Sequence, residues 1–236
     1  MKIALIGYGK MGHEIEAAAL EQGETIAATF DVGNPVDVAS LANADVCIEF
    51  STPHTALQNI RVALEAKKDI VVGTTGWYEH LPDIRLLVKD SGLLYSPNFS
   101  IGVNMMFRLV SAAAEMMNNA SAYDPWIHEW HHRQKADSPS GTALKLGEIL
   151  LAKMDRKKKL ETARVDGKID PAALHVSSTR VGTVPGTHIV GFDSDADSIE
   201  IKHLAKSRRG FALGAVRAAQ WLKGKKGVYT MDDVEL

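Results

Sequence analysis

The chain has 236 residues, of which 45% are hydrophobic and 24% are charged, and its formal net charge is −2. This balance is typical of a globular protein long enough for one large domain or two smaller ones. It argues against a nucleic-acid-binding surface, which needs a clustered basic excess. Cys47 is the only cysteine, so the sequence excludes a disulfide framework and a thiolate metal cluster.

The sequence begins directly with a strand-like run, MKIALIG, and no hydrophobic leader followed by a cleavage site precedes it. No apolar run approaches the ~18 residues that a membrane-spanning helix needs. We therefore expect a cytoplasmic protein that has no membrane partner.

Short β-rich runs and helical stretches alternate over the first part of the chain. The predicted strands are 2–7, 25–31, 44–50, 69–75 and 92–97. The predicted helices are 10–22, 53–66 and 79–91. This alternation implies βαβ units and therefore a parallel sheet with helices on both faces. Such sheets bind ligands outside the carboxyl ends of their strands.

The pattern changes after residue 102. A long apolar helix, a strand and a second helix are predicted at 103–120, 125–132 and 141–154. Three further strand-like runs, separated by turn signals, are predicted at 173–182, 186–192 and 197–205. A helix at 211–223 and a short tail close the chain. We interpret the basic run at 156–159 as a solvated helix end.

These patterns predict an α/β protein with a Rossmann-type parallel sheet domain and an inserted α+β mixed-sheet domain. Residues 1–102 and 211–236 would form the dinucleotide-binding domain. Residues 103–210 would form the inserted domain, to which we assign substrate binding and oligomerisation.

The segment GYGKMG at 7–12 has the pattern G-x-G-x-x-G directly after a strand and at the start of a helix. Gly7 permits the tight turn, Gly9 lets the backbone approach a pyrophosphate, and Gly12 allows close helix packing. The helix N-terminus adds amide hydrogens and a favourable dipole. We therefore assign the whole loop to cofactor binding: Gly7, Tyr8, Gly9, Lys10, Met11 and Gly12.

Asp31 lies after the second predicted strand, where a carboxylate accepts hydrogen bonds from the adenosine ribose. It favours NADH because a carboxylate repels the 2′-phosphate of NADPH, although Lys10 could offset that repulsion. We expect NADH to be preferred and NADPH to be tolerated. Two later strand ends offer small residues, hydroxyls and backbone amides for the nicotinamide half: Gly73, Thr74, Thr75, and Ser96, Pro97, Asn98, Phe99.

His128, Glu129 and His132 match H-E-x-x-H, the zinc-peptidase pattern. Zinc binding needs a helix, in which residues i and i+4 lie about 5–6 Å apart. In a strand the same residues lie roughly 13 Å apart, at ~3.3 Å per residue. The flanking residues are aromatic or β-branched, and Trp126, His128, Trp130 and His132 would share one face of a strand. We therefore predict no metal site and assign Glu129 no catalytic role.

Downstream, Asp137, Ser138 and Ser140 are N-cap residue types, and a helical pattern begins near Gly141. Free amides of Ser140, Gly141 and Thr142, together with the helix dipole, would suit a carboxylate. Cationic or proton-carrying side chains approach the same space from the preceding strand and loop: His131, His132 and Lys135. The array is typical of a site for an anionic substrate.

Several motifs together resemble the 4-hydroxy-tetrahydrodipicolinate reductase (dihydrodipicolinate reductase) family. They are GYGKMG, EFSTP, VVGTTG, SPNFSIGVN, HEWHHRQKADSPSGTAL and the closing GAVRAAQWLKGKKGVYTMDDVEL, in the family's order. The pattern HHRxK…PSGTAL is specific to the family. The glycine loop is one residue shorter than in some members, and no arginine follows Asp31 to bind a 2′-phosphate.

The resemblance implies NAD(P)H-dependent reduction of 4-hydroxy-tetrahydrodipicolinate to tetrahydrodipicolinate, in diaminopimelate and lysine synthesis. It implies that His131 and Lys135 are the catalytic pair, with Lys135 as the favoured proton donor. It implies that His132, Gly141 and Thr142 bind the dicarboxylate, and that homotetramers assemble through the inserted sheets.

Other functions remain open at this point. The chain could be another two-domain NAD(P)-dependent dehydrogenase of amino-acid metabolism. An aspartate-semialdehyde dehydrogenase type would need a nucleophilic cysteine, for which Cys47 in a buried strand is a poor candidate. A non-catalytic NADH-sensing regulator would not need the convergent histidines and lysine, and a zinc peptidase would need the helix that the sequence disfavours.

Overall fold

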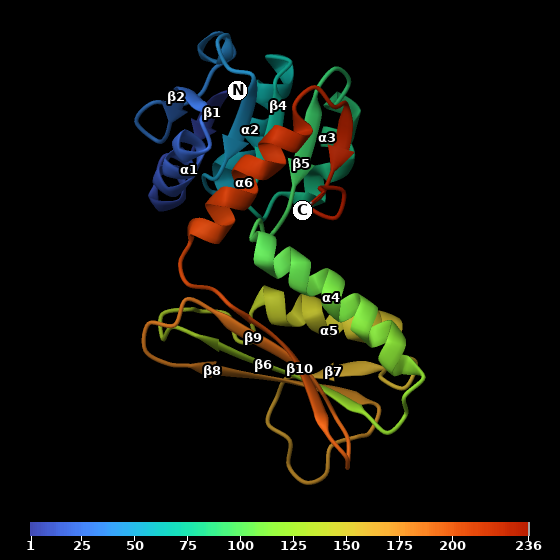
Figure 1. Ribbon diagram of the computed structural model, residues 1–236. Helices are drawn as coiled ribbons and strands as arrows, with labels where there is room; N and C mark the ends of the chain where they lie inside the picture. Colours follow the sequence, from blue (N-terminus) through green and yellow to red (C-terminus); the bar gives the residue numbers. More distant parts are fainter. Residues whose placement is uncertain (236) are drawn as a thin grey trace. The chain divides into compact units, whose positions relative to one another are not determined.

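The structure, a computed structural model, describes residues 1–235 and divides into two compact units (Figure 1). One unit comprises residues 1–101 together with the chain from residue 208 onward, and the other comprises residues 102–207. No described helix is both long enough and apolar enough to cross a lipid bilayer.

The first unit contains a six-stranded sheet in the order β11-β5-β4-β3-β1-β2, and every pairing in it is parallel. Its strands are β1 (Lys2–Ile6), β2 (Thr25–Phe30), β3 (Val46–Glu49), β4 (Asp69–Val72), β5 (Gly92–Tyr95) and β11 (Gly227–Tyr229). The strand order reverses on either side of β1, which is where parallel sheets of this type bind ligands. The prediction of a Rossmann-type parallel sheet is confirmed.

Helices cover both faces of this sheet. They are α1 (Lys10–Glu21), α2 (Pro53–Glu65), α3 (Leu81–Leu87) and α6 (Arg209–Leu222), with short 3₁₀ turns η1 (Ala39–Leu41) and η2 (Tyr78–His80). Successive strand residues point to opposite faces, so Leu5 packs in the core with Ile15 of α1, whereas Ile6 packs with Ile60 of α2. Burial on both faces explains why these strands are continuous apolar runs.

Two elements of the first unit differ from the predictions. The helix predicted over 79–91 is the turn η2 followed by α3, which ends before Val88 because that residue is not helical, with ψ 88°. The predicted tail contains the edge strand β11. Asp69 stabilises this edge, since its two carboxylate oxygens accept from the backbone amides of Gly92 (2.7 Å) and Gly224 (2.8 Å). A strand of three residues is too short to show a hydrophobic period.

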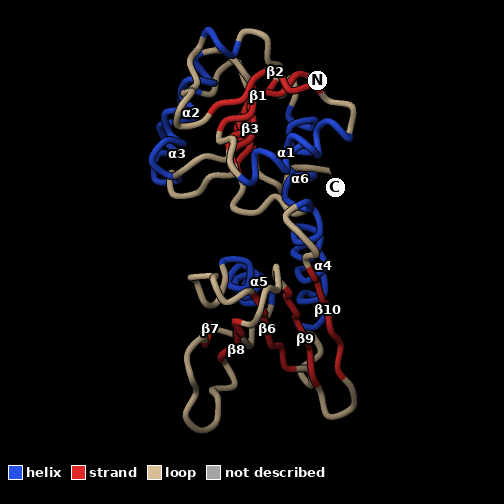
Figure 2. The backbone as a smooth tube through the Cα atoms, turned by 90° about the vertical axis from the view of Figure 1, so that its left-hand side faces the viewer, coloured by secondary structure: helices blue, strands red, loops and turns tan. Residues whose placement is uncertain are grey.

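The second unit contains a mixed sheet in the order β10-β9-β6-β8-β7. Its elements are α4 (Ile101–Asn118), β6 (Asp124–His131), α5 (Gly141–Lys153), β7 (Lys159–Glu161), β8 (Ala173–Arg180), β9 (Thr187–Asp193) and β10 (Ser198–Leu204). Strand β6 is parallel to β8 and antiparallel to β9. Figure 2 shows α5 beside these strands, and Val110 of α4, Leu146 of α5 and Val190 of β9 share one core.

Strand β6 has a strict alternation of burial. Pro125, Ile127, Glu129 and His131 are buried on the face that carries the helices, and the residues between them are half-buried or exposed on the other. The prediction that HEWH forms a strand is confirmed, but the strand ends at His131, so the expected place of His132 in it is wrong. His128 and Glu129 lie in a strand rather than in the helix that H-E-x-x-H needs for zinc.

The basic run at 156–159 is not a solvated helix end, so that interpretation is wrong. Lys157 is only 3% exposed, and its ammonium donates to the carbonyls of Pro171 (2.9 Å) and Ala173 (2.8 Å). Arg156 donates to the carbonyls of Met117 and Asn118 at the end of α4. Arg156 thus satisfies carbonyls at the C-terminal end of α4, and Lys157 satisfies carbonyls just before and at the start of β8.

Candidate functional site

In the first unit, the glycine loop between β1 and α1 has the geometry that a dinucleotide phosphate requires. Gly7 has φ +94°, and a Cβ there would lie 2.3 Å from the Phe50 carbonyl oxygen. A Cβ on Gly12 would lie 2.6 Å from the Gly7 oxygen, whereas one on Gly9 would meet nothing within 4 Å. Gly9 is also the N-cap of α1 and has no side chain to cap the first amides. The loop thus leaves open backbone at a helix N-terminus.

Asp31 lies directly after β2, beside that loop. Gly7 and Tyr8 both donate their amides to the Phe30 carbonyl, which holds the start of the loop against the end of β2. The Asp31 side chain is exposed, and its Oδ1 accepts from the amide of Gly33 (3.0 Å). The arrangement places one exposed carboxylate at the carboxyl edge of the sheet, where a ribose hydroxyl could donate to it.

The segments after β4 and β5 lie at the same edge of the sheet. A Cβ on Gly73 would meet the Phe50 ring at 2.2 Å, so only glycine fits beside this aromatic side chain. Thr74 and Ser96 are buried, and the Ser96 hydroxyl donates to the Asn98 carbonyl (2.9 Å) and accepts the Asn98 amide (3.1 Å). Phe99 is buried against Phe50, with ring centroids 5.6 Å apart. These segments are compact and polar, which fits the role that the sequence predicts for them.

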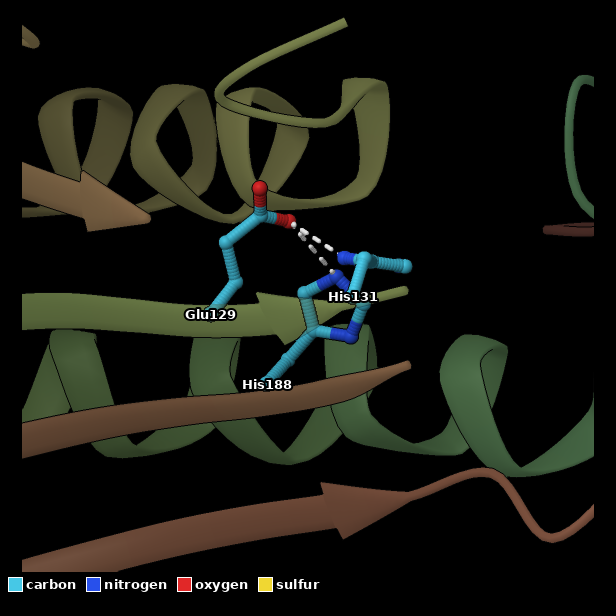
Figure 3. A group of neighbouring side chains, drawn as sticks. All are labelled: Glu129, His131 and His188. Atoms are coloured by element: carbon cyan, nitrogen blue, oxygen red, sulfur yellow. Dashed lines mark ion pairs between the residues drawn. The ribbon is translucent and has the colours of Figure 1, made fainter. Parts of the chain in front are cut away.

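In the second unit, Glu129 of β6 is the centre of a buried polar cluster (Figure 3). Its side chain is fully buried, and its Oε1 accepts from the Ser140 amide (2.9 Å) and from Arg180 Nη2 (2.9 Å). Its Oε2 accepts from the Ser140 hydroxyl and lies 3.2 Å from His131 Nδ1 and 3.3 Å from His188 Nε2. The His131 contact is close but poorly aligned for a hydrogen bond.

The cluster keeps Glu129 ionised. Burial by itself raises the pKa of the carboxyl, but the polar contacts with His131, His188, Ser140 and Arg180 outweigh burial and hold that pKa far below its usual range. Burial lowers the pKa of His188, against the opposing pull of Glu129, so its ring is neutral at pH 7. When the neutral His188 ring donates from Nε2, its Nδ1 carries no proton. This Nδ1 is buried without a hydrogen-bond partner among the described residues.

Glu129, His131 and His188 could also be considered as metal ligands, since one donor atom from each lies within 4.8 Å of the others. The surrounding donors do not fit a cation. Arg180 and two hydrogen-bond donors of Ser140 already point at the same carboxylate. The cluster is therefore better described as the Glu129 carboxylate surrounded by hydrogen-bond donors than as a metal centre.

Lys135 lies in the loop between β6 and α5. Its ammonium pairs with Asp137 at 2.7 Å, and the side chain is 25% exposed. Burial raises the pKa of the Asp137 carboxyl, but the hydrogen bond and charge of Lys135 outweigh this and hold it below its usual value. His132 follows the last residue of β6 and is half-buried. The loop therefore brings a partly exposed cation close to the start of α5.

Ser140 is the N-cap of α5, as its residue type predicts, and its hydroxyl accepts from the Ala143 amide (3.2 Å). The prediction of a free amide at Ser140 is wrong, because that amide donates to Glu129. Gly141 is exposed, and a Cβ built on it would meet nothing within 4 Å. The exposed backbone at the N-terminus of α5 thus begins at Gly141, whose amide donates to the Asp137 carboxyl.

Three members of the cluster were not predicted from the sequence: Glu129, Arg180 and His188. Glu129 was detectable, because the period of two that places Trp126 and Trp130 on one face places Glu129 on the buried face with Ile127. A buried carboxylate requires donors. Arg180 and His188 come from β8 and β9, and no local pattern indicated that these strands flank β6.

A parallel sheet with a glycine loop after β1 and a carboxylate after β2 defines the class of Rossmann-type, nicotinamide-dependent oxidoreductases. Comparison with known families specifies the protein further. Residues 1–99 match the family model described as dihydrodipicolinate reductase, N-terminus, and residues 102–234 match the corresponding C-terminus. The chain belongs to the dihydrodipicolinate reductase family.

Individual relatives agree with this assignment. The chain is 42% identical to the curated 4-hydroxy-tetrahydrodipicolinate reductase of Christiangramia forsetii, over 99% of this chain and 97% of the relative. It is 37% identical to that of Neisseria gonorrhoeae, over 93% and 83%. A solved structure of a dipicolinate-bound dihydrodipicolinate reductase from Paenisporosarcina sp. TG-14 has the same fold, with a TM-score of 0.81, 23% identity, and coverage of 98% and 97%.

Proposed function

We propose that the chain catalyses the NAD(P)H-dependent reduction of 4-hydroxy-tetrahydrodipicolinate to tetrahydrodipicolinate, a step of diaminopimelate and lysine biosynthesis in the cytoplasm. The observation that carries the proposal is the family match over both units, from residue 1 to residue 234. The convergence of His131, Lys135 and the start of α5 in the second unit supports it, because a dicarboxylate needs several donors.

In the first unit, the glycine loop binds the cofactor pyrophosphate and Asp31 binds the adenosine ribose. The segments Gly73–Thr75 and Ser96–Phe99 hold the nicotinamide half. The bound cofactor supplies a hydride. The protein's contribution there is to place the cofactor and to exclude water, through buried residues such as Phe99.

In the second unit, His132, Gly141 and Thr142 bind the substrate carboxylates. The N-terminus of α5 favours an anion because its amides and its dipole both point outward there. Both polar groups of Ser140 are engaged by Glu129 and Ala143, so Ser140 contributes by fixing the start of the helix.

Lys135 and His131 are the catalytic pair, and Lys135 donates the proton. Reduction of a conjugated ring builds negative charge on the substrate, which the Lys135 ammonium and the helix N-terminus stabilise. Asp137 pairs with that ammonium in the structure, at 2.7 Å. We infer that the substrate carboxylate takes over this contact when it binds.

NADH is the preferred cofactor, and NADPH is tolerated. The exposed Asp31 carboxylate supports this preference, since it repels a 2′-phosphate, and no arginine lies nearby in the sequence after it. A KM for NADPH more than about tenfold below that for NADH would contradict this assignment of Asp31.

The chain forms a homotetramer through the sheet of the second unit. One face of that sheet packs against α4 and α5, while the other presents Trp126, His128 and Trp130 of β6. His128 accepts from Trp130 Nε1, and its Nδ1 lies 2.6 Å from the Ser177 hydroxyl. Trp130→Glu should therefore shift the mass measured by light scattering to a smaller species, whereas a wild-type monomer would contradict the tetramer.

The assignment of the two ligand sites is tested by calorimetry with NADH and with pyridine-2,6-dicarboxylate as a stable flat dicarboxylate. Asp31→Ala should weaken NADH binding, whereas His132→Ala should weaken dicarboxylate binding. Asp31→Ala should not change the affinity for the dicarboxylate measured without NADH, and His132→Ala should not change the affinity for NADH measured without the dicarboxylate. The reason is that the two residues belong to different units. Loss of dicarboxylate binding in Asp31→Ala would contradict the assignment.

A thiol-dependent semialdehyde dehydrogenase does not fit the chain. Cys47 lies in β3 with 0% exposure, and burial raises the pKa of its thiol to about 12. The thiolate that such chemistry requires is therefore not formed near pH 7.

A further inference from the structure

Glu129 is a buried charge that fold stability alone does not explain. Taking a carboxylate out of water costs several kcal/mol, and replacing buried ion pairs by apolar residues of similar volume is often neutral or stabilising. The helix-covered face of the same sheet is otherwise largely apolar, with Ile127, Val176 and Val190 in its core. An ionised group retained among such residues calls for a role other than packing.

The contacts of Glu129 define that role, because they reach three separate parts of the proposed substrate site. Its Oε2 lies 3.2 Å from His131 Nδ1, at the end of β6. Both of its oxygens accept from Ser140, the N-cap of α5. Arg180 donates both to Glu129 and to the carbonyl of Asp137, in the loop that carries Lys135. One carboxylate therefore connects the strand end, the helix start and the loop between them.

The same contacts fix the His131 ring. A carboxylate only accepts hydrogen bonds, so the nitrogen next to it, Nδ1, must carry a proton to avoid repulsion between lone pairs. The second ring nitrogen, Nε2, is then the one that does not contact Glu129. A Cβ on Gly186 would lie 2.8 Å from His131 Nε2, so the glycine provides the space that the ring occupies. His188 packs edge-on to the ring, with centroids 5.1 Å apart.

We propose that Glu129 is a positioning residue for the reduction: its carboxylate sets the ring orientation and tautomer of His131 and ties the Lys135 loop to the start of α5. The inference rests on the proposed function, and it makes Glu129 act through other groups rather than on the substrate itself.

The test is Glu129→Gln, which keeps the shape of the side chain and one carbonyl that can accept from Ser140, but removes the charge. The residues that bind the substrate carboxylates are unchanged in this variant, so the KM for 4-hydroxy-tetrahydrodipicolinate should change by less than about threefold. Misplaced catalytic groups should lower kcat roughly ten- to a hundredfold. Glu148→Gln is the matched control, because it removes the same charge from an exposed position on α5, and it should match the wild type.

A spectroscopic measurement separates positioning from general damage. In protein labelled with ¹⁵N-histidine, the His131 ring nitrogens should show the Nδ1–H form in the wild type at neutral pH. Glu129→Gln should give a mixture of tautomers, and NADH binding should remain unchanged. A kcat within twofold of the wild type together with unchanged His131 signals would overturn the proposal.

The proposal about Glu129 can still be tested if the wild type gives no turnover or if the variant does not fold. If the wild type gives no turnover, the proposed function fails, but the His131 signals still decide whether Glu129 sets the tautomer. If Glu129→Gln does not fold, Arg180→Met is measured instead, since Arg180 is only partly buried and also contacts Glu129 and Asp137. Its kcat should fall by about fivefold or more, and an unchanged kcat with unchanged His131 signals would again overturn the proposal.

Discussion

Replacing Lys135 by alanine tests the assignment of the proton donor. The structure indicates that this change should affect chemistry far more than stability. Lys135 is 25% exposed, and its partner Asp137 is 54% exposed. A pair this exposed contributes about 0–1 kcal/mol to the free energy of unfolding. The melting temperature of Lys135→Ala should therefore stay close to that of the wild type.

The effect on catalysis should be larger. Loss of a positioned proton donor costs roughly 10²- to 10⁴-fold in rate. This corresponds to about 2.7–5.4 kcal/mol of activation free energy, at about 1.36 kcal/mol for each tenfold change. The dissociation constant for NADH should stay within about twofold, because Asp31 and the glycine loop belong to the other unit.

The assay is steady-state oxidation of NADH with saturating substrate, combined with fluorescence titration of NADH. Lys145→Ala is the matched control, since it removes an exposed lysine of α5 that pairs with the exposed Glu148. The control should match the wild type. Full turnover in Lys135→Ala would refute the role of Lys135 as proton donor, and an equal loss in Lys145→Ala would show that net charge, not position, matters.

Three further predictions follow from single contacts. Asp31→Ala should raise the KM for NADH and lower the ratio of kcat/KM for NADH to that for NADPH, as measured by initial rates with both cofactors. Gly73→Ala should destabilise the first unit by about 1–3 kcal/mol in chemical denaturation, because its Cβ would overlap the Phe50 ring. The pKa of Glu129 in the folded state lies below the ordinary value of a glutamate, so its ionised form stabilises the fold above that ordinary value, and this stabilisation is lost as the pH falls toward the folded-state pKa. In the acid range below the ordinary glutamate pKa, the free energy of unfolding should therefore fall more steeply with pH for the wild type than for Glu129→Gln; parallel curves would contradict an ionised Glu129.

The sequence predicted the elements whose signals are local. The glycine loop, the parallel strands and the strand HEWH all follow from periods and turn residues within a few positions. The zinc pattern was set aside on the alternation around Trp126 and Trp130, and β6 has that alternation. Ser140 was one of three N-cap candidates by residue type, and it is the one that caps α5.

The features that the sequence did not predict depend on contacts between distant segments. Lys157 is buried because it meets the carbonyls of Pro171 and Ala173, which a local charge run does not indicate. The cluster at Glu129 needs Arg180 and His188, which the strand order β9-β6-β8 brings to either side of β6. The contacts of the Glu129 carboxylate follow from the strand order of the sheet and not from the local sequence.

Reduction of 4-hydroxy-tetrahydrodipicolinate by this chain is tested most directly by the loss of NADH absorbance. The purified protein is mixed with NADH and with substrate formed in situ from pyruvate and aspartate semialdehyde by the synthase that condenses them. We expect rapid oxidation of NADH that requires every component and nearly disappears in Lys135→Ala. Binding of NADH without any substrate-dependent oxidation would contradict it and would favour a cofactor-sensing protein instead.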